Sequence, residues 1–339
     1  MADIGRVFGN RVMELRFRTG EAEDLQVGEM LVVEEEGARF LVRTMDVLYG
    51  ADSEDEGYLE RQAGAALRGG LDYERVKGDL YKVGVCTPLG CLKEGEYRKA
   101  KSIPRHFSAV RRADQRDYDF LRPMMGDVEV GRLRSGDRVL DFRVGVASRS
   151  FPYHVGIFAT TGMGKSNLMK SLALACMESR RCGFLILDPH GEYFDGGERG
   201  KKGLTHSKLA PEALDVYSSR RLDGPHSSIH LSSAEIEIPD LANLYEFSGA
   251  QLECLQASQW KYGERWLEEL RDRSVAAIVS DLNGRFHEGT VNVIKRRLDS
   301  IFQFDLVTTD RNLSMTRAVI TALQGGKTVL VDTSGMFEA

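Results

Sequence analysis

Apolar and polar side chains alternate along the first part of the chain. In the segment 13–18 (MELRFR), the apolar residues Met13, Leu15 and Phe17 are separated by charged residues. This period of two predicts a β-strand with one face in water. The segment 30–47 (MLVVEEEGARFLVRTMDV) carries β-branched and aromatic residues on both sides of a polar Glu-Glu-Gly turn, a pattern typical of a β-hairpin.

Two further segments continue this β pattern. A strand is predicted at 82–86 (KVGVC), and the segment 128–146 repeats the hairpin pattern around a Ser-Gly-Asp turn at 135–137. Short strands of this kind often close on themselves, because closure removes their free edges. Residues 1–150 are therefore expected to contain a small antiparallel β domain, either a barrel or a sandwich.

From residue 154 onward, the pattern changes to alternating strands and helices. The predicted elements are a strand at 154–159 (HVGIFA), a helix at 165–180 and a strand at 183–188 (GFLILD). One face of the helix carries Leu168, Leu172, Ala175 and Cys176. The continuous apolar run at 184–187 is typical of a strand that is covered on both faces. These elements form a βαβ unit, and shorter strands are expected at 214–218 and 229–231.

After Pro239, most of the segment 240–325 is predicted to be helical. Ser248 and Gln251 have the spacing of a capping box. One face of a later helix, which begins near Thr290, carries Val291, Ile294, Leu298, Ile301 and Phe302. Several helices without intervening strands indicate a bundle inserted into the α/β domain. A last buried strand is predicted within 326–332 (GKTVLVD).

The composition is that of a globular protein with at least two domains: 339 residues, 42% hydrophobic and 29% charged. No apolar run approaches the roughly 20 residues that span a bilayer, and the N-terminus lacks a secretory signal. A cytoplasmic protein without a membrane partner is therefore expected. The net charge of −5 does not favour nucleic-acid binding, but a phosphate-binding channel needs only local basic residues. The five cysteines show no CxxC spacing and are expected to be reduced thiols.

The clearest chemical motif lies at 159–166 (ATTGMGKS), between a predicted strand and a predicted helix. It matches the phosphate-binding P-loop, except that alanine replaces the first glycine. The two glycines let backbone N–H groups surround phosphate oxygens, the lysine adds positive charge at the β- and γ-phosphates, and the serine hydroxyl can bind Mg²⁺. The predicted cofactors are ATP and Mg²⁺. The predicted nucleotide-binding residues are Thr161, Gly162, Met163, Gly164, Lys165, Ser166 and Asn167.

A second motif, DPHGEY at 188–193, ends the predicted strand 183–188. Ligands bind at the carboxyl ends of strands in open parallel sheets, so Asp188 is expected near the P-loop. Asp188 and Glu192 are candidates for ordering water or Mg²⁺. Together with Lys165 they form the candidate catalytic set, and Ser166 and Asp188 are the candidate metal ligands. An ordinary turn after a strand is the alternative, and the motif alone leaves both open.

These motifs give the chain a resemblance to the HerA-like hexameric DNA translocases, within the FtsK/HerA group of P-loop ATPases. The resemblance rests on the strand-rich N-terminal part, the sequences ATTGMGKSNLMK, FLILDPHGEY and GKTVLVDTSG, and the helical insertion. It covers the chain from Ile4 onward. The P-loop is shared by many nucleotide-binding proteins, whereas DPHGEY at this spacing is much more specific to the family.

The resemblance implies an N-terminal β-barrel that serves ring assembly and partner docking, a RecA-like motor fold, and ATP bound between neighbouring subunits near Asp188. It implies a hexameric ring that threads duplex DNA as a bipolar translocase and works with a NurA-type nuclease in DNA end resection for recombination repair. The expected α/β organisation is a β-barrel domain and connector at 1–150, a first part of the RecA-like P-loop core at 151–239, a helical insertion at 240–325 and a further core strand at 326–339.

One departure from the family concerns the last residues. Family members continue beyond the strand that matches KTVLVD into a Walker B strand with a catalytic acidic residue, and then to an arginine that acts across the subunit boundary. Neither follows here, and Asp332 belongs by family register to the preceding strand. We therefore expect a C-terminally incomplete motor, from a truncated or fragmentary chain, that binds ATP but hydrolyses it weakly or not at all.

Two basic segments of the sequence are candidates for contact with DNA. The glycine-rich segment 194–204 carries Arg199, Lys201 and Lys202 and is a candidate pore loop that contacts phosphates; a solvated surface loop is the alternative. The basic segment 97–122 is expected to join the two domains, where an interface role is as plausible as DNA contact. Trp260 and Trp266 are expected to pack within the helical region instead of stacking on bases.

Three functional hypotheses follow from these motifs. The leading one is an ATP-driven DNA translocase or helicase subunit. The second is an ATP-binding module that does not hydrolyse ATP and instead assembles rings or recruits a nuclease. The third, a small-molecule P-loop kinase, predicts a compact domain with an arginine-rich lid, and the helical insertion, DPHGEY and the β domain all count against it.

Overall fold

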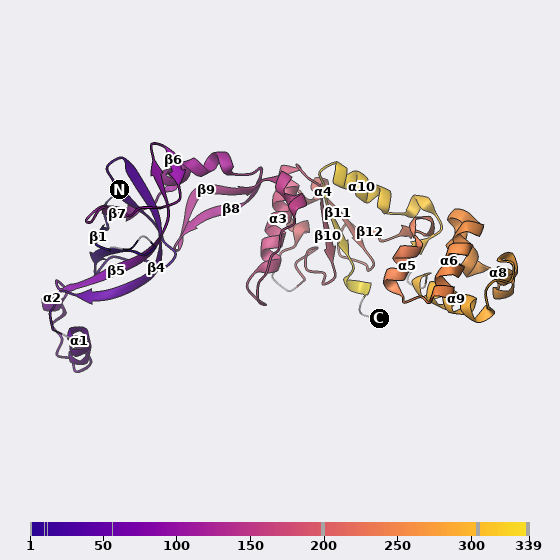
Figure 1. Cartoon of the computed structure of the whole chain (residues 1–339), viewed down its shortest axis with the longest axis horizontal. Helices are drawn as coiled ribbons and strands as arrows, with labels where there is room; N and C mark the ends of the chain where they lie inside the picture. The colour runs from indigo at the N-terminus through magenta and orange to yellow at the C-terminus, as the bar shows by residue number, and fades with distance from the viewer. Residues whose placement is uncertain are drawn as a thin grey trace. The chain divides into compact units, whose positions relative to one another are not determined.

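A computed structural model of the chain describes residues 2–9, 11, 13–55, 57–197, 201–302 and 306–336. The chain divides into two compact units, Met1–Ala147 and Ser148–Ala339. Figure 1 shows strands throughout the first unit and a sheet with covering helices in the second. Within the described ranges, every helix is too short or too polar to cross a membrane.

The first unit is built on a closed antiparallel barrel. Its strands are β1 (Gly5–Val7), β2 (Leu15–Gly20), β3 (Met30–Glu35), β4 (Ala38–Ala51), β5 (Leu80–Lys93) and β7 (Ala109–Arg112). They are hydrogen-bonded in the order β2-β1-β7-β3-β4-β5, and β5 pairs back with β2. The short β6 (Glu96–Arg98) continues from the end of β5. The predicted β domain is therefore a barrel, and closure pairs the strand edges that an open sheet would expose.

Strand alternation decides which side chains fill the barrel. Leu15 and Phe17 are buried as predicted, whereas Met13 precedes β2 and is 78% exposed. The predicted hairpin at 30–47 is confirmed as β3 and β4, with Gly37 in the left-handed region at the turn. The main buried cluster consists of Val7, Leu15, Phe17, Leu25, Leu31, Val33, Phe40, Val42, Cys86 and Val110.

Other elements of the first unit attach to the barrel. Helices α1 (Tyr58–Leu67) and α2 (Tyr73–Val76) connect β4 to β5. The 3₁₀ helix η1 (Gln115–Met124) precedes the hairpin of β8 (Val128–Ser135) and β9 (Arg138–Val146), which confirms the hairpin predicted at 128–146. Tyr118 and Phe142 pack against Val32 and Leu41. Because Val32 alternates with the barrel-facing residues Leu31 and Val33, η1 and the hairpin cover the outer surface of the barrel.

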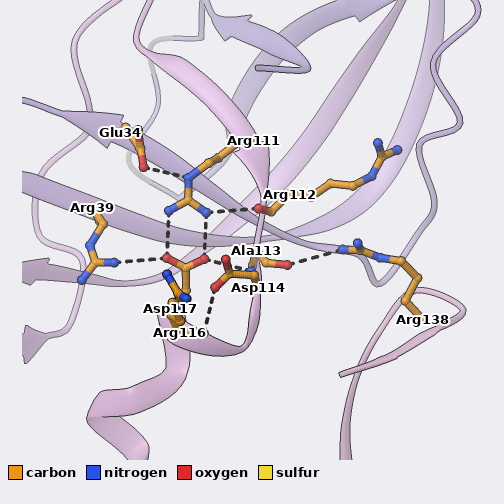
Figure 2. A network of polar contacts seen from close by, with 9 residues as sticks. All are labelled: Glu34, Arg39, Arg111, Arg112, Ala113, Asp114, Arg116, Asp117 and Arg138. Atoms are coloured by element: carbon orange, nitrogen blue, oxygen red, sulfur yellow. Dashed lines mark hydrogen bonds and ion pairs between the residues drawn. The ribbon is translucent and has the colours of Figure 1, made fainter. Parts of the chain in front are cut away.

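A network of ion pairs also attaches η1 to the barrel (Figure 2). The buried carboxylate of Asp117 accepts hydrogen bonds from Arg111 at 2.7 and 2.8 Å and from Arg39 at 3.2 Å. The segment 97–122 thus lies within the first unit, and the prediction that it joins the two domains is wrong. Two arginines of this basic segment are paired with acidic residues: Arg111 with Glu34 of β3 and Asp117 of η1, and Arg112 with Glu29, which directly precedes β3.

The second unit contains a parallel sheet with strand order β10 (Phe184–Asp188), β15 (Thr328–Asp332), β11 (Leu214–Ser218) and β12 (Ser227–Ser228). Helix α3 (Lys165–Ser179) packs on one face, where Ala173 and Met177 contact Ile186 and Leu330. Helix α10 (Thr316–Gln324) packs on the other face, through Ala322 against Val329 and Val331. The strands predicted at 183–188, 214–218 and 326–332 are confirmed.

Two expectations for the edge of this sheet are wrong. Residues 154–159, predicted as a strand, form no regular element, and Phe158 is 94% exposed. Within the described structure, β10 is consequently an edge strand. Its Leu185 and Leu187 are 45% and 67% exposed, so β10 is not covered on both faces as its apolar run suggested. Leu168 is also exposed, because α3 turns Ala173, Cys176 and Met177 toward the sheet instead.

The remaining helices form a separate buried cluster within the second unit. They are α5 (Ile238–Leu244), α6 (Gly249–Tyr262), α7 (Trp266–Asp272), α8 (Val275–Asp281) and α9 (Glu288–Phe302). Short α4 (Ala210–Ala213) precedes β11, and β13 (Leu231–Ser232) pairs with β14 (Val307–Thr308). The capping box of Ser248 and Gln251 is confirmed. Trp266 is buried in the cluster as expected, but Trp260 is 89% exposed, so its predicted packing is wrong.

Candidate nucleotide-binding site

The P-loop sequence lies directly before α3, which begins at Lys165. Gly162 and Gly164 have φ angles of 84° and 86°, in the left-handed region that disfavours other residues. Apart from the glycine itself and its two neighbours in sequence, no described atom lies within 4 Å of the position that a Cβ would take at either glycine. The loop is therefore open to a ligand, and the first turn of α3 contributes backbone N–H groups that lack partners within the helix.

The packing of α3 places the P-loop at the carboxyl edge of the parallel sheet. Helix α3 lies against the sheet and β10 starts soon after the helix ends, so the two elements run in opposite directions. With 15 residues in α3 and 5 in β10, their lengths are about 22 and 16 Å. Lys165 therefore lies just beyond the end of β10. In parallel sheets this edge is where ligands bind.

Three polar residues end neighbouring strands at this edge. Asp188 of β10 and Ser218 of β11 both stand opposite Asp332 of β15 in the strand register. They are 1%, 2% and 0% exposed. The structure therefore brings together Asp188 and Asp332, two carboxylates that are far apart in sequence, on the edge that also carries the P-loop.

The Asp188 carboxylate holds the DPHGEY turn. Its oxygens accept hydrogen bonds from the backbone N–H groups of His190 at 3.2 Å and Tyr193 at 2.9 Å. Burial, followed by the negative charges of Asp188 and Glu192, raises the pKa of Tyr193. Glu192 is half-buried in the same turn. Asp188 therefore ends β10 and holds the turn that carries Glu192, which is a structural role besides any contact with a ligand.

The Asp332 carboxylate is bound by residues that sequence reasoning missed. It accepts hydrogen bonds from Ser334 N at 2.9 Å, Ser334 Oγ at 2.6 Å and Ser218 Oγ at 3.4 Å. Arg220 Nε donates to it at 3.2 Å. The available signal was positional, since Ser218, Arg220 and Ser334 all lie at or just beyond the ends of apolar strands, where parallel sheets bind ligands.

Some of the residues present suit a bound nucleotide with Mg²⁺. The open glycine backbone, Lys165 and the start of α3 suit phosphate groups. Ser166 lies at the second position of α3, where a P-loop hydroxyl binds Mg²⁺, and Mg²⁺ often uses few protein ligands. In the described residues, no group of three or more histidine, cysteine or acidic side chains forms a metal cluster. Asp188, the other candidate metal ligand, is 1% exposed and accepts a backbone hydrogen bond at each of its oxygens.

The predicted DNA contacts are only partly described. Arg199 lies outside the described residues, whereas Lys201 and Lys202 are exposed. The base of their loop is attached to the second unit, because Leu204 N donates to Tyr193 O at 2.8 Å and both Phe194 and Leu204 are buried. Lys201 and Lys202 therefore follow the DPHGEY turn closely, on a loop whose base is held by the core.

Comparison with known proteins identifies the family. A family model described as "Helicase HerA, central domain" matches residues 128–338, which is more than half of the chain. The match begins at the first residue of β8 and includes the P-loop, the DPHGEY turn, the helical cluster and β15. A search of the curated proteins found no match. With the P-loop at the carboxyl edge of a parallel sheet, the chain belongs to the family of the HerA helicase central domain.

Proposed function

We propose that this chain is the ATP-binding motor subunit of a HerA-type DNA translocase, with a RecA-like core. The observation that carries the proposal is the open, glycine-containing P-loop at the start of α3, on the same sheet edge as Asp188 and Asp332. Membership of the HerA central-domain family supports a P-loop ATPase that acts on DNA.

In this proposal, each P-loop group has a separate task. Backbone N–H groups around Gly162 and Gly164 bind phosphate oxygens, and the Lys165 ammonium balances their negative charge. Ser166 supplies a hydroxyl ligand to Mg²⁺, which withdraws charge from the phosphates when it is bound. Asp188 keeps the DPHGEY turn in place, and Glu192 from that turn orders water beside the phosphates.

The assembly that we propose is a ring of six copies around duplex DNA, working as a bipolar translocase with a NurA-type nuclease in DNA end resection. A ring suits the site, because a P-loop that is exposed in one chain can be completed by a neighbouring subunit. Lys201 and Lys202 are the described candidates for contacts with DNA phosphates, since they are exposed in the segment that follows the DPHGEY turn.

A second candidate is an ATP-binding module that assembles rings or recruits a nuclease without hydrolysing ATP. The state of the two edge carboxylates favours it. Asp188 and Asp332 are both buried, and both accept hydrogen bonds from protein groups. A general base must reach the attacking water, and neither carboxylate is exposed to do so in this arrangement.

The test is to measure ATP binding by fluorescence and ATP hydrolysis by phosphate release, each with and without duplex DNA. We expect Lys165→Ala to weaken ATP binding at least about tenfold, because a charged hydrogen-bond donor to the phosphates is lost. Hydrolysis that DNA stimulates in the wild type and that Lys165→Ala abolishes supports the translocase; binding without hydrolysis supports the assembly module. Unchanged ATP binding in Lys165→Ala contradicts both.

A further inference from the structure

Arg220 brings a guanidinium group to the carboxyl edge of the sheet. It follows the last residue of β11 by two positions, and its backbone N–H donates to Ser218 Oγ at 3.1 Å. Its Nε donates to Asp332 Oδ2 at 3.2 Å. Asp332 is fully buried and is held by Ser334 as well, so the carboxylate provides a fixed anchor for the base of the guanidinium.

The other end of the Arg220 side chain reaches the DPHGEY turn. Gly191, in the middle of that turn, has a φ of 67°. A Cβ at Gly191 would lie 2.8 Å from an Nη nitrogen of Arg220 and 3.0 Å from Ser334 Oγ. The absence of a side chain at Gly191 therefore lets the guanidinium lie against the turn. Arg220 connects the loops that follow β10, β11 and β15, whose strands are adjacent in the sheet.

The Arg220 side chain remains 48% exposed although its anchor Asp332 is 0% exposed. Within the described residues, the hydrogen bond of the guanidinium to Asp332 uses Nε, and the Nη groups make no hydrogen bond. An arginine held at Nε presents its Nη donors in a fixed direction, and such a fork matches the oxygens of a phosphate group. The pairing with Asp332 orients the fork without using the donors that a phosphate needs.

We infer that Arg220 recognises the terminal phosphate of a nucleoside triphosphate bound at the P-loop. The inference rests on the proposed function. The P-loop holds the β-phosphate at the start of α3, and the next phosphate extends beyond it along the edge where β10 and β15 end. Because Arg220 also lies against Gly191, its contact with the terminal phosphate communicates the difference between triphosphate and diphosphate to the DPHGEY turn.

The experiment compares the affinities of the full chain for ADP and for a non-hydrolysable ATP analogue, using fluorescent nucleotides. We expect Arg220→Gln to weaken binding of the ATP analogue about tenfold and binding of ADP by less than about twofold, because only the triphosphate accepts the Nη donors. Arg221→Gln is the matched control, since Arg221 is the next residue and is also exposed. Its two affinities are expected to match the wild type.

Two further variants separate recognition from folding. Arg220→Lys keeps the positive charge but loses the two Nη donors, so it is expected to lower the preference for the ATP analogue over ADP. This variant serves as the test if thermal unfolding shows that Arg220→Gln is unstable. Asp332→Asn is expected to lower the same preference by loosening the orientation of Arg220. The inference alone is overturned if Arg220→Gln and Arg220→Lys both leave the ratio of the ATP-analogue and ADP affinities unchanged while Lys165→Ala abolishes binding of both nucleotides. Unchanged binding of both nucleotides in Lys165→Ala overturns the proposed function instead.

Discussion

At the scale of single residues, Asp117 is the clearest case of a buried charge that depends on its partners (Figure 2). It is 2% exposed and belongs to η1, whereas Arg111 and Arg39 come from β7 and β4. The backbone N–H of Asp114 adds a hydrogen bond at 2.9 Å. Removing one partner of such a group leaves the other buried charge uncompensated.

The pKa of Asp117 predicts how this network responds to acid. Burial by itself raises the pKa, but the hydrogen bonds from Arg111 and Asp114 and the charges of Arg111 and Arg39 outweigh it, so the pKa is lowered. A lowered folded-state pKa means that the stabilisation is present above the unfolded-state value of about 3.9 and is lost as the pH falls through the folded-state value. The barrel unit is therefore expected to lose stability below about pH 4.

We expect Asp117→Asn to destabilise the barrel unit by about 3 kcal/mol at pH 7 and to remove part of its acid dependence. The measurement is urea unfolding at pH 7 and pH 3, with hydrogen exchange of peptides from β7 as the probe of the barrel unit. Asp119→Asn is the control, because Asp119 forms an exposed pair with Arg122, which contributes less than about 1 kcal/mol. Equal stabilities of the two variants at pH 7 would argue against the network.

At the scale of elements, α6 shows how a local signal and a distant contact combine. Ser248 and Gln251 cap its first turn, with Ser248 N donating to Gln251 Oε1 at 3.0 Å. Cys254 and Leu255 of the same helix are buried in the cluster that contains Trp266. The sequence has two tryptophans, and Trp260 is exposed. A Trp260→Phe background therefore makes Trp266 a reporter of the helical cluster alone.

In that background, we expect Ser248→Ala to lower the stability of the helical cluster by about 1 kcal/mol, because the N-cap hydrogen bond to Gln251 N is lost. The measurement is urea unfolding followed by Trp266 fluorescence. Gln256→Ala is the control, since Gln256 is exposed on the same helix and its loss is expected to cost less than about 0.5 kcal/mol. A cost of the same size in both variants would contradict a role for the cap.

At the scale of the whole molecule, the segment that follows the first unit and leads into the P-loop is largely exposed. Residues 154–160 form no regular element, and the trypsin sites that flank them are exposed: Arg149, in the 3₁₀ helix η2 (Ser148–Tyr153), and Lys165, the first residue of α3. Protease attack concentrates on exposed segments of this kind. A ligand that binds the P-loop covers Lys165 but leaves Arg149 unchanged.

We therefore expect limited trypsin digestion to cut first after Arg149 and Lys165, with ATP protecting the bond after Lys165 only. Mass spectrometry of the fragments over time gives both rates. AMP serves as the control nucleotide, because it lacks the β- and γ-phosphates that the P-loop binds. Equal protection by AMP, or early cleavage within the barrel strands, would contradict the proposed site or the division into units.

The amino-acid sequence by itself determined most helices and strands, because local sterics and hydrogen bonds set the period of each element and where it ends. The alternation at Leu15 and Phe17, the capping box at Ser248 and the glycines before Lys165 all act within a few residues. They were sufficient to predict β2, the start of α6 and the P-loop before α3.

Tertiary structure decided what lies far apart in sequence or depends on neighbours. An apolar run does not distinguish a central strand from an edge strand. Both β15 and β10 have such a run, yet β15 is buried throughout, whereas Leu185 and Leu187 of β10 are exposed. Barrel closure required the pairing of β2 with β5. The contact of Arg220 with Asp332 crosses 112 positions of sequence and arises only because β11 and β15 pair in register. Long-range pairing, which no local pattern encodes, therefore assembled the polar edge of the site.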